Sequence, residues 1–151
     1  MQQRLSAGVL VEHEDRLLLV RHVRPGKYDF WVAPGGGVQD EEELSAAAQR
    51  EVREETGLEV IAGNLLYIEE LVQPDLRICK FWYSGHLRGG ELSVAAPEAQ
   101  AEHITEAAWL SRADLQTKTV FPPALLSRYW EDRCNEHAGP VHLGLRKMDF
   151  W

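Results

Sequence analysis

Residues 36–58 of this chain read GGVQDEEELSAAAQREVREETGL, and this stretch decides the fold class. The acidic residues 40–43 favour the start of an α-helix after a glycine-rich loop, and three consecutive alanines with other good helix formers continue it through residues 44–56. On such a helix Glu51, Glu54 and Glu55 stand at spacings i, i+3 and i+4, so they project from one face. Like charges at these spacings repel one another. A cation is therefore expected between them, and a hard divalent ion such as Mg²⁺ takes carboxylate oxygens.

The same stretch fits the pattern G-x5-E-x7-R-E-U-x-E-E-x-G-U, in which U is a bulky aliphatic residue. The matching residues are Gly36, Glu42, Arg50, Glu51, Val52, Glu54, Glu55, Gly57 and Leu58. This pattern is the signature of the Nudix hydrolases, and the chain resembles them over this segment. The resemblance implies an α/β fold, a mixed β-sheet between α-helices (an α/β/α sandwich). It also implies an enzyme that uses Mg²⁺ or Mn²⁺ to hydrolyse the pyrophosphate linkage of a nucleoside diphosphate derivative.

The resemblance also assigns expected roles to the residues of this segment. Glu51 and Glu55 are the expected metal ligands, and Glu54 is a ligand or a water-orienting group. The Gly36 carbonyl is expected to complete the metal site, since glycine lets the backbone come close. The alternative is that these charges form only a solvated helix face. All specified positions of the pattern are matched, including its glycines and Arg50, and this complete match disfavours a merely solvated helix face.

Further acidic and basic residues are expected to support this centre. Arg50 can hold a catalytic carboxylate through a bidentate pair, and Glu42 can buttress the glycine loop. Members of the family often recruit another glutamate from a loop ahead of a tryptophan-containing strand. Glu102 is our choice for that catalytic role, with Glu98 and Glu106 as competitors, and an acidic loop residue without a role is the alternative for Glu102.

Basic and aromatic residues that precede the glycine loop are candidates for substrate contacts. They are Arg21, Arg24, Lys27, Tyr28, Phe30 and Trp31, and Trp82 and Tyr83 farther along the chain are equally ambiguous aromatic candidates. An arginine fork matches phosphate oxygens, and an aromatic ring can stack on a base. Each also has a structural alternative, because such charges are common on surfaces and aromatic residues of a short strand are more often core.

Length and charge limit the function further. A chain of 151 residues suits one domain, here residues 1–151, with a real core. The formal net charge is −8 and the basic residues are scattered, which argues against binding to a nucleic acid polymer.

No apolar stretch approaches the roughly 20 residues of a membrane span. Two cysteines without a CxxC spacing favour a reduced, cytoplasmic location.

Hydrophobic patterning predicts the remaining elements. A hairpin of strands 4–12 and 16–23 and a short strand 29–33 precede the helix, which Gly57 is placed to end. Further strands are expected over 58–63, 65–72, 78–87 and 106–110, and helices over 111–115 and 122–134. The order β-β-β-α-β-β-β-β-α predicts a mixed sheet covered by helices.

The substrate itself stays open at this level. Pro74 lies sixteen residues after Leu58, where ADP-ribose-cleaving members of the family often carry a proline, but turns favour proline in any case. ADP-ribose-like compounds, nucleotide sugars and nucleoside triphosphates all remain in view. The alternative to an enzyme is a catalytically weak Nudix domain that acts as a nucleotide-binding sensor. Such domains usually lack glutamates of the pattern, and all of them are present here.

The C-terminal tail carries a large apolar load for a free end. Its apolar residues are Leu143, Leu145, Met148, Phe150 and Trp151. So many apolar groups in water would invite aggregation, so the tail is expected to dock. It can dock as an edge strand of its own sheet or across a homodimer interface. The resemblance favours a homodimer.

Overall fold

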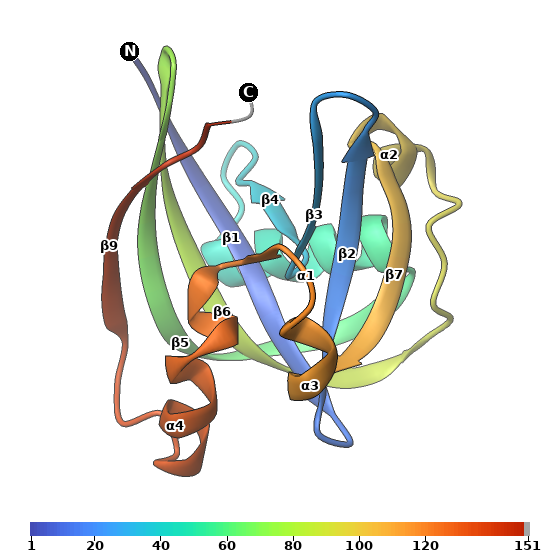
Figure 1. The fold of residues 1–151 in the computed structure, drawn as a ribbon, viewed down its shortest axis with the longest axis vertical. Coiled ribbons are helices and arrows are strands. Elements are labelled where there is room, and N and C mark those ends of the chain that lie inside the picture. Colours follow the sequence, from blue (N-terminus) through green and yellow to red (C-terminus); the bar gives the residue numbers. More distant parts are fainter. Residues whose placement is uncertain (150–151) are drawn as a thin grey trace.

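The first two strands start as the predicted hairpin and then separate. The computed structural model describes residues 1–149 and contains β1 (Gln2–His13) and β2 (Arg16–Arg24). Next to the turn, Glu12 pairs with Leu17 and His13 with Arg16. Over the rest of its length β1 runs parallel to β6 (Leu76–Gly90), and β4 (Gly35–Gly37) pairs with it antiparallel. The hairpin therefore splits to join two parts of one curled sheet (Figure 1).

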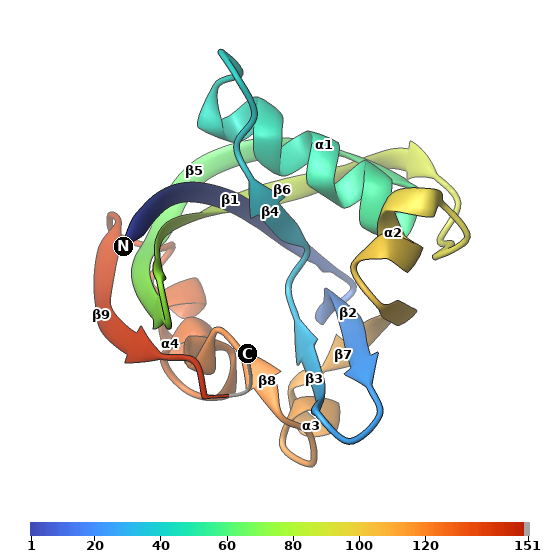
Figure 2. The same cartoon turned by 90° about the horizontal axis from the view of Figure 1, so that it is seen from above.

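The sheet is mixed and strongly curled, as Figure 2 shows. Its order is β8-β3-β2-β1-β6-β5-β9, with β4 and β7 paired to β1 and β2. The predicted strands 58–63 and 65–72 form one long strand, β5 (Leu58–Gln73), whose register shifts between Ala62 and Tyr67. The remaining strands are β3 (Tyr28–Val32), β7 (Ile104–Ser111), β8 (Val120–Phe121) and β9 (Val141–Lys147). Patterning missed the short strands β4 and β8, since two or three residues carry no periodicity.

Helix α1 (Leu44–Thr56) ends where predicted, begins after the acidic residues 40–43 that were expected at its start, and lies against the outer face of the curl (Figure 2). Gly57 ends it in the left-handed conformation at φ 76°, with its N–H donating to the Arg53 carbonyl. The buried face of α1 consists of Ala47, Ala48 and Val52, which pack against strand residues such as Val9. Small side chains on this face let the helix lie close to the sheet.

Short helical segments cover the opposite, inner face. They are α3 (Arg112–Leu115), the 3₁₀ turn η1 (Pro123–Leu126) and α4 (Arg128–Cys134). The prediction of one helix over 122–134 was wrong, because Ser127 takes φ −143° and ψ −96° and separates η1 from α4. Leu115, Leu125 and Trp130 join Trp82 of β6 in the larger core cluster. Helices thus lie on both faces of a mixed sheet, as predicted.

Two further elements shape the site and the tail. Helix α2 (Pro97–Ala101), which was not predicted, precedes β7. Strand β9 runs parallel to β5, from the pair Tyr67–Val141 to the pair Val72–Lys147, so the tail docks as an edge strand of its own chain. Phe150 and Trp151 lie outside the described residues, and the homodimer stays a prediction. Among residues 1–149, no helix is long and apolar enough to cross a membrane.

Candidate functional site

Strand β4 brings backbone directly under the carboxylates of α1. Its three glycines pair with Ser6 to Gly8 of β1. A Cβ on Gly36 would lie 2.6 Å from Cδ of Glu51, so only glycine leaves room for this carboxylate. The N–H of Gly35 donates to Oε1 of Glu55 over 2.8 Å. The glycine strand and the helix thus form one unit in which carboxylates meet backbone.

Arg50 connects the acidic residues around this unit. It forms a bidentate pair with Glu42, at 3.1 Å from Nε and 2.7 Å from Nη2. Its Nη1 donates to Oε1 of Glu51 and Oε2 of Glu54, each over 3.0 Å, and its Nη2 donates to the Gly37 carbonyl over 3.0 Å. These hydrogen bonds hold the pKa of Glu42 below its usual range. The bidentate pair expected between Arg50 and a catalytic carboxylate is thus formed with Glu42, and Glu51 and Glu54 each accept a single hydrogen bond.

The carboxylates nearest β4 carry more negative charge than their surroundings favour. Glu55 is only 3% exposed; burial raises its pKa well above the usual range, and the charge of Glu51 raises it further. Burial also raises the pKa of Glu51. Lys80 faces the same groups, and burial lowers its pKa while Glu69, Glu55 and Glu51 oppose that change. A further cation between Glu51 and Glu55 would relieve this unfavourable burial of charge.

A cavity of about 390 Å³ opens beside these groups, here called the glutamate cavity. Glu51, Glu54 and Glu55 line one side, and Glu98 and Glu102 line it from α2 and its C-terminal end. Its lining includes one basic side chain, that of Arg4. Glu102 therefore faces the glutamates of α1, and its charge contributes to the raised pKa values of Glu51 and Glu55, whereas its catalytic role stays a prediction.

The two competitors for the position of Glu102 differ in where they lie. Glu98 shares the glutamate cavity with it. Glu106 lies on β7 and pairs with Arg21 over 3.2 Å. The geometry therefore leaves Glu102 and Glu98 as the acidic residues that face α1.

The residues of the glutamate cavity fit a hard divalent cation by their chemistry. Carboxylate oxygens and backbone carbonyls are the ligands that Mg²⁺ and Mn²⁺ prefer. Burial raises the pKa of Glu51 and Glu55, and a bound cation would favour the charged form of both carboxyl groups. In residues 1–149 no three His, Cys, Asp or Glu side chains converge closely enough to enclose an ion, and Arg50 partly neutralises Glu51 and Glu54. Binding would therefore bring the donors closer together.

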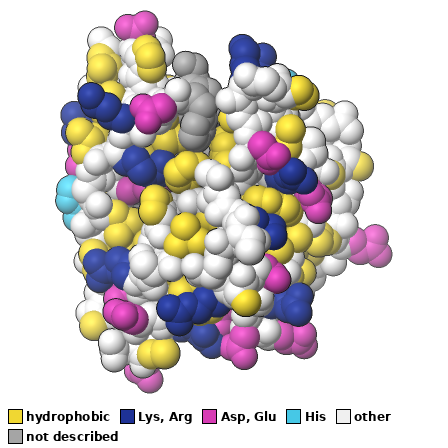
Figure 3. Space-filling view, in the orientation of Figure 1, with side chains coloured by type: hydrophobic (Ala, Val, Ile, Leu, Met, Phe, Trp, Pro, Cys, Tyr) yellow, Lys and Arg dark blue, Asp and Glu magenta, His cyan; other side chains and the backbone are white. Residues whose placement is uncertain are grey.

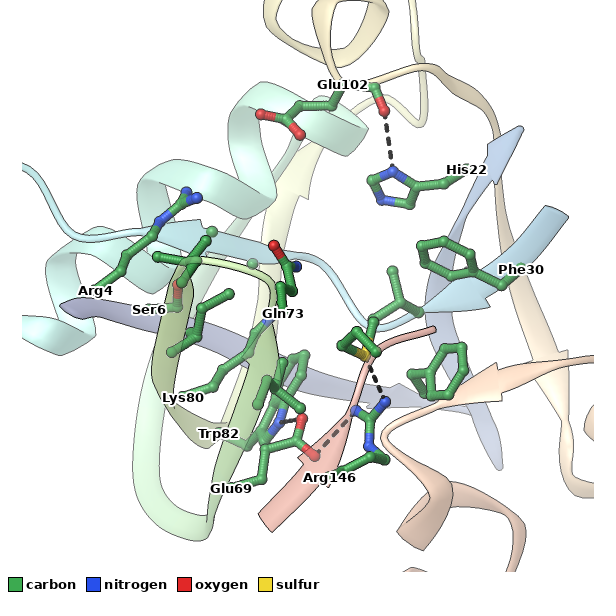
Figure 4. A pocket seen from close by; sticks show the side chains of 18 residues that line it. Arg4, Ser6, His22, Phe30, Glu69, Gln73, Lys80, Trp82, Glu102 and Arg146 are labelled. Carbon is green, nitrogen blue, oxygen red and sulfur yellow. Dashed lines mark hydrogen bonds and ion pairs between the residues drawn. The ribbon is translucent and has the colours of Figure 1, made fainter. Parts of the chain in front are cut away.

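A second, smaller cavity of about 220 Å³ lies on the inner side of the sheet, here called the inner cavity (Figure 4). Phe30 and Phe121 line it as an edge-to-face pair with ring centroids 5.5 Å apart. His22 stacks on Phe30 at 5.1 Å, and its Nδ1 donates to the carbonyl of Glu102 over 3.0 Å. Arg4 and Glu102 line both cavities, so the two are adjacent.

Among the predicted substrate residues, Phe30 lines the inner cavity, whereas five others line neither cavity. They are Arg21, Arg24, Lys27, Tyr28 and Trp31. Arg21 pairs with both carboxylate oxygens of Asp29, at 2.9 and 2.8 Å, and Trp31 is 7% exposed within the core. Arg24 and Lys27 lie at the turn between β2 and β3, and Tyr28 begins β3. Arg24 and Tyr28 share the sheet face of His22 and Phe30 but lie at the turn end of the strands. The role of these five residues as substrate contacts stays a prediction.

Strand register explains why Arg21 and Trp31 do not reach the inner cavity. Arg21 pairs with Trp31 and His22 with Phe30, so the two pairs point to opposite faces of the sheet. The inner cavity receives His22 and Phe30. Lys80 was also missed, although a charged residue between Ile78 and Trp82 at period two signals a cation on an inward face.

Comparison with known proteins is consistent with this geometry. The profile of the NUDIX domain matches residues 2–129. The 8-oxo-dGDP phosphatase NUDT18 of Homo sapiens is 33% identical over 110 residues, 73% of this chain and 32% of that protein. Diphosphoinositol polyphosphate phosphohydrolase 2 of Rattus norvegicus is 51% identical over 59 residues, 39% of this chain and 32% of that protein. Each match spans about a third of the relative's length.

Solved structures share the fold. A NUDIX hydrolase of Nitrosomonas europaea superposes with a TM-score of 0.75 at 22% identity, over 92% of this chain and 93% of that one. An ADP-ribose pyrophosphatase of Streptococcus suis gives a TM-score of 0.68 at 22% identity, over 92% of this chain and 98% of that one. At this identity the likeness shows the fold alone.

Proposed function

This chain belongs to the NUDIX family, and from that premise we propose that it hydrolyses the pyrophosphate linkage of a small nucleoside diphosphate derivative or nucleotide with a divalent cation. The observation that carries the proposal is the glutamate cavity. Five glutamates line it, and two of them, Glu51 and Glu55, have raised pKa values. A site with this excess of negative charge suits a substrate whose phosphates bind together with a cation.

We assign the residues of α1 and β4 to cation binding. Glu51, Glu54, Glu55 and the Gly36 carbonyl would hold Mg²⁺ or Mn²⁺. Bound there, the ion would supply positive charge that neutralises phosphate oxygens during phosphoryl transfer. Arg50 keeps the carboxylates of Glu51 and Glu54 in place through its two 3.0 Å contacts.

The reaction itself needs a base and an attacking water. In this proposal Glu54 or Glu102 takes a proton from a water that attacks one phosphorus atom. A bond from that phosphorus to the bridging oxygen breaks, and each product ends in a phosphate group. Both glutamates line the cavity from opposite elements, α1 and the end of α2, so a phosphate between them is within reach of either.

The adjacent inner cavity offers a place for the nucleoside. The names of related proteins include an 8-oxo-dGDP phosphatase and an ADP-ribose pyrophosphatase, and we propose a substrate of the same general kind for this chain. Figure 3 shows acidic and basic side chains interspersed over the face it presents, without one continuous basic patch. That distribution suits a small substrate better than a nucleic acid polymer. The homodimer and the cytoplasmic location stay predictions.

The first prediction tests the metal site directly. Glu51→Gln and Glu55→Gln each remove a metal-binding charge and little volume, so the fold should survive. We expect kcat to fall about a hundredfold or more, because a few kcal/mol of transition-state stabilisation corresponds to that factor. Phosphate-ended products are measured over a panel of nucleotides, nucleotide sugars and ADP-ribose, with and without Mg²⁺. Glu59→Gln is the matched control, since Glu59 has a half-exposed side chain 3.6 Å from Arg53.

The results separate the enzyme from the sensor. Near-wild-type turnover of both glutamine variants at saturating Mg²⁺ would refute the site assignment. Mg²⁺-dependent nucleotide binding without turnover of any compound in the wild-type protein would favour the nucleotide-binding sensor.

A further inference from the structure

Part of the inner cavity is built by the C-terminal strand. Arg146 of β9 and Met148 just beyond it line the cavity together with Glu69 and Trp82 (Figure 4). The family profile ends at residue 129, so this wall lies outside the matched region. Arg146 and Met148 are therefore candidates for residues that give this chain its own ligand specificity.

The guanidinium of Arg146 is held in a defined orientation. Its Nη2 donates to Oε2 of Glu69 over 3.2 Å, and Oε1 of Glu69 accepts from Nε1 of Trp82 over 3.0 Å. Glu69 is 3% exposed, so this carboxylate has little access to water. The Arg146 Cζ lies 4.5 Å from the ring centroid of Phe121, within the range of a cation–π contact. A carboxylate and an aromatic ring thus orient the guanidinium plane.

The donors of Arg146 are not well satisfied by the protein. A guanidinium carries five N–H donors. Nη1 contacts Sδ of Met148 at 2.8 Å, and a thioether is a weak acceptor. Nε is buried and has no hydrogen-bond partner among the described residues. Since a methionine side chain is flexible, a ligand oxygen could displace the sulfur and offer Nη1 a stronger acceptor.

The size and walls of the inner cavity suit one planar ring system. Its volume of about 220 Å³ is below the roughly 300–1,000 Å³ of sites for drug-sized ligands. Phe30, Phe121, Val32, Leu71 and Ile78 supply aromatic and aliphatic walls. Phosphates would then remain in the adjacent glutamate cavity. The ring that fits here is the base of the nucleotide.

We propose that Arg146 is a specificity-determining residue that selects bases with a keto oxygen, such as guanine or uracil, over adenine. The inference rests on the proposed function, because it takes the inner cavity as the base site. A guanidinium can donate to the keto oxygen and ring nitrogen of guanine, and a keto oxygen of uracil is also an acceptor. Adenine places an amino group, itself a donor, where guanine has the keto oxygen. Two donors would then face each other.

A purely structural role for Arg146, neutralising Glu69, makes a different prediction. The test measures calorimetric binding of the non-hydrolysable α,β-methylene analogues of GDP and ADP in the presence of Mg²⁺. The wild-type protein should bind the GDP analogue roughly 5- to 150-fold more tightly, the range for one good bidentate contact to a base. Arg146→Lys keeps a cation beside Glu69 but loses the planar fork. In this variant the ratio of the affinities for the GDP and ADP analogues should fall towards one, while the melting temperature stays close to that of the wild-type protein.

His142→Ala is the matched control. His142 also belongs to β9 and its Nε2 contacts Glu70 of β5 at 2.7 Å, but it does not line the inner cavity. This variant should keep the wild-type preference for the GDP analogue. In steady-state assays Arg146→Lys should raise KM for a guanosine substrate and leave kcat nearly unchanged. This result is expected when the lost contact stabilises the bound substrate and the transition state equally.

Several outcomes would overturn the inference. They are an unchanged preference in Arg146→Lys, tighter binding of the ADP analogue by the wild-type protein, and no binding of either analogue. Binding of the analogues is measured without hydrolysis. If binding shows a preference for the GDP analogue that depends on Arg146, and no nucleotide is hydrolysed in the activity assays, the proposed hydrolase is refuted and the proposed selection by Arg146 stands. Equal kcat/KM for guanosine and adenosine substrates would refute the selection by Arg146 and leave the hydrolase standing.

Discussion

At the scale of single residues, Gly35 and Gly36 of β4 are needed for two different reasons. A Cβ on Gly35 would lie 2.7 Å from the Ala7 carbonyl oxygen and from the Gly8 Cα, both backbone atoms of β1. A Cβ on Gly36 would instead meet the carboxylate of Glu51, the far end of a flexible side chain. Gly35 is thus needed for strand pairing, and Gly36 is needed for the position of a carboxylate.

Gly36→Ala and Gly35→Ala should therefore have different effects. In Gly36→Ala the Glu51 carboxylate can swing away, so we expect a folded protein whose hydrolytic kcat is reduced about tenfold or more. In Gly35→Ala the backbone itself must shift, at a cost of about 1–3 kcal/mol in the free energy of unfolding, typical of overpacking. Urea unfolding and product assays on both variants check this. Full activity in Gly36→Ala would show that the Glu51 position is unimportant for turnover.

His22 makes stability depend on pH. Burial lowers the pKa of His22 to about 4, and its Nδ1 donates to the Glu102 carbonyl. In the unfolded chain a histidine has a pKa of about 6.5, so the unfolded state takes up the proton first as the pH falls. The free energy of unfolding should then decline from about pH 6.5 to about pH 4, with no contribution from His22 above that window.

The variant His22→Gln tests this pH effect. Glutamine offers an N–H donor for the Glu102 carbonyl and does not titrate, so the decline between about pH 6.5 and 4 should become shallower. Urea unfolding at several pH values measures it, with replacement of the exposed His86 by glutamine as the control. A decline that is identical in wild type and His22→Gln would rule out His22 as its source.

At the scale of elements, α1 has two faces with different tasks. Ala47, Ala48 and Val52 pack on the sheet, and the edge with Glu51 and Glu55 faces β4 and the glutamate cavity. The helix must stop abruptly, because β5 begins at Leu58, directly after Gly57. The left-handed conformation of Gly57 makes this change of direction possible.

Gly57→Ala should destabilise the protein without touching the glutamate cavity. At φ 76° a Cβ is strained, and here it would also collide with the Glu91 carbonyl oxygen. We expect the free energy of unfolding to fall by about 1–3 kcal/mol, the usual cost of such strain. Gly89→Ala is the control, since a Cβ there meets no atom within 4 Å and should change stability by about 0.5 kcal/mol or less. Equal unfolding midpoints for the two variants would contradict this account of Gly57.

At the scale of the whole molecule, the curled sheet keeps its helices on two faces and its C-terminal strand at one edge. Strand β9 adds to β5, and its residues Val141 and Leu143 pack against the larger core cluster. The same strand carries Arg146 into the inner cavity. Removal of β9 therefore affects both the core and the cavity.

Truncation after Gly139 tests how the tail contributes to stability and assembly. Loss of the β5–β9 ladder and of two partly buried apolar side chains should cost about 3 kcal/mol, or roughly 6–12 °C in melting temperature. Light scattering and thermal unfolding of both lengths measure it. A wild-type monomer that loses stability would support docking within the chain. A dimer that becomes a folded monomer would show that the tail joins two chains, and unchanged size and stability would refute both roles.

The spacing of residues 36–58 was enough to predict several features correctly. It predicted helix α1 and its end at Gly57, the gathering of Glu51, Glu54 and Glu55 on one face, and the family. These features are local, since a helix turns by a constant angle per residue and the glycines lie a few residues away. The presence of Glu102 beside these glutamates was also expected, through resemblance to the family.

Tertiary structure alone decided which strand residues reach the inner cavity. A strand shows alternate residues to opposite faces, so a shift of one position exchanges His22 and Phe30 for Arg21 and Trp31. That choice depends on pairing with the neighbouring β3 and with the distant β7, in which Glu106 lies opposite Arg21 and 85 residues away in the chain. Arg146 reaches Glu69 in the same way, because β9 pairs with β5 across more than seventy residues of chain. Local spacing determines the position of the carboxylates on the helix, whereas strand register, including pairing between strands distant in the sequence, determines which side chains line the inner cavity.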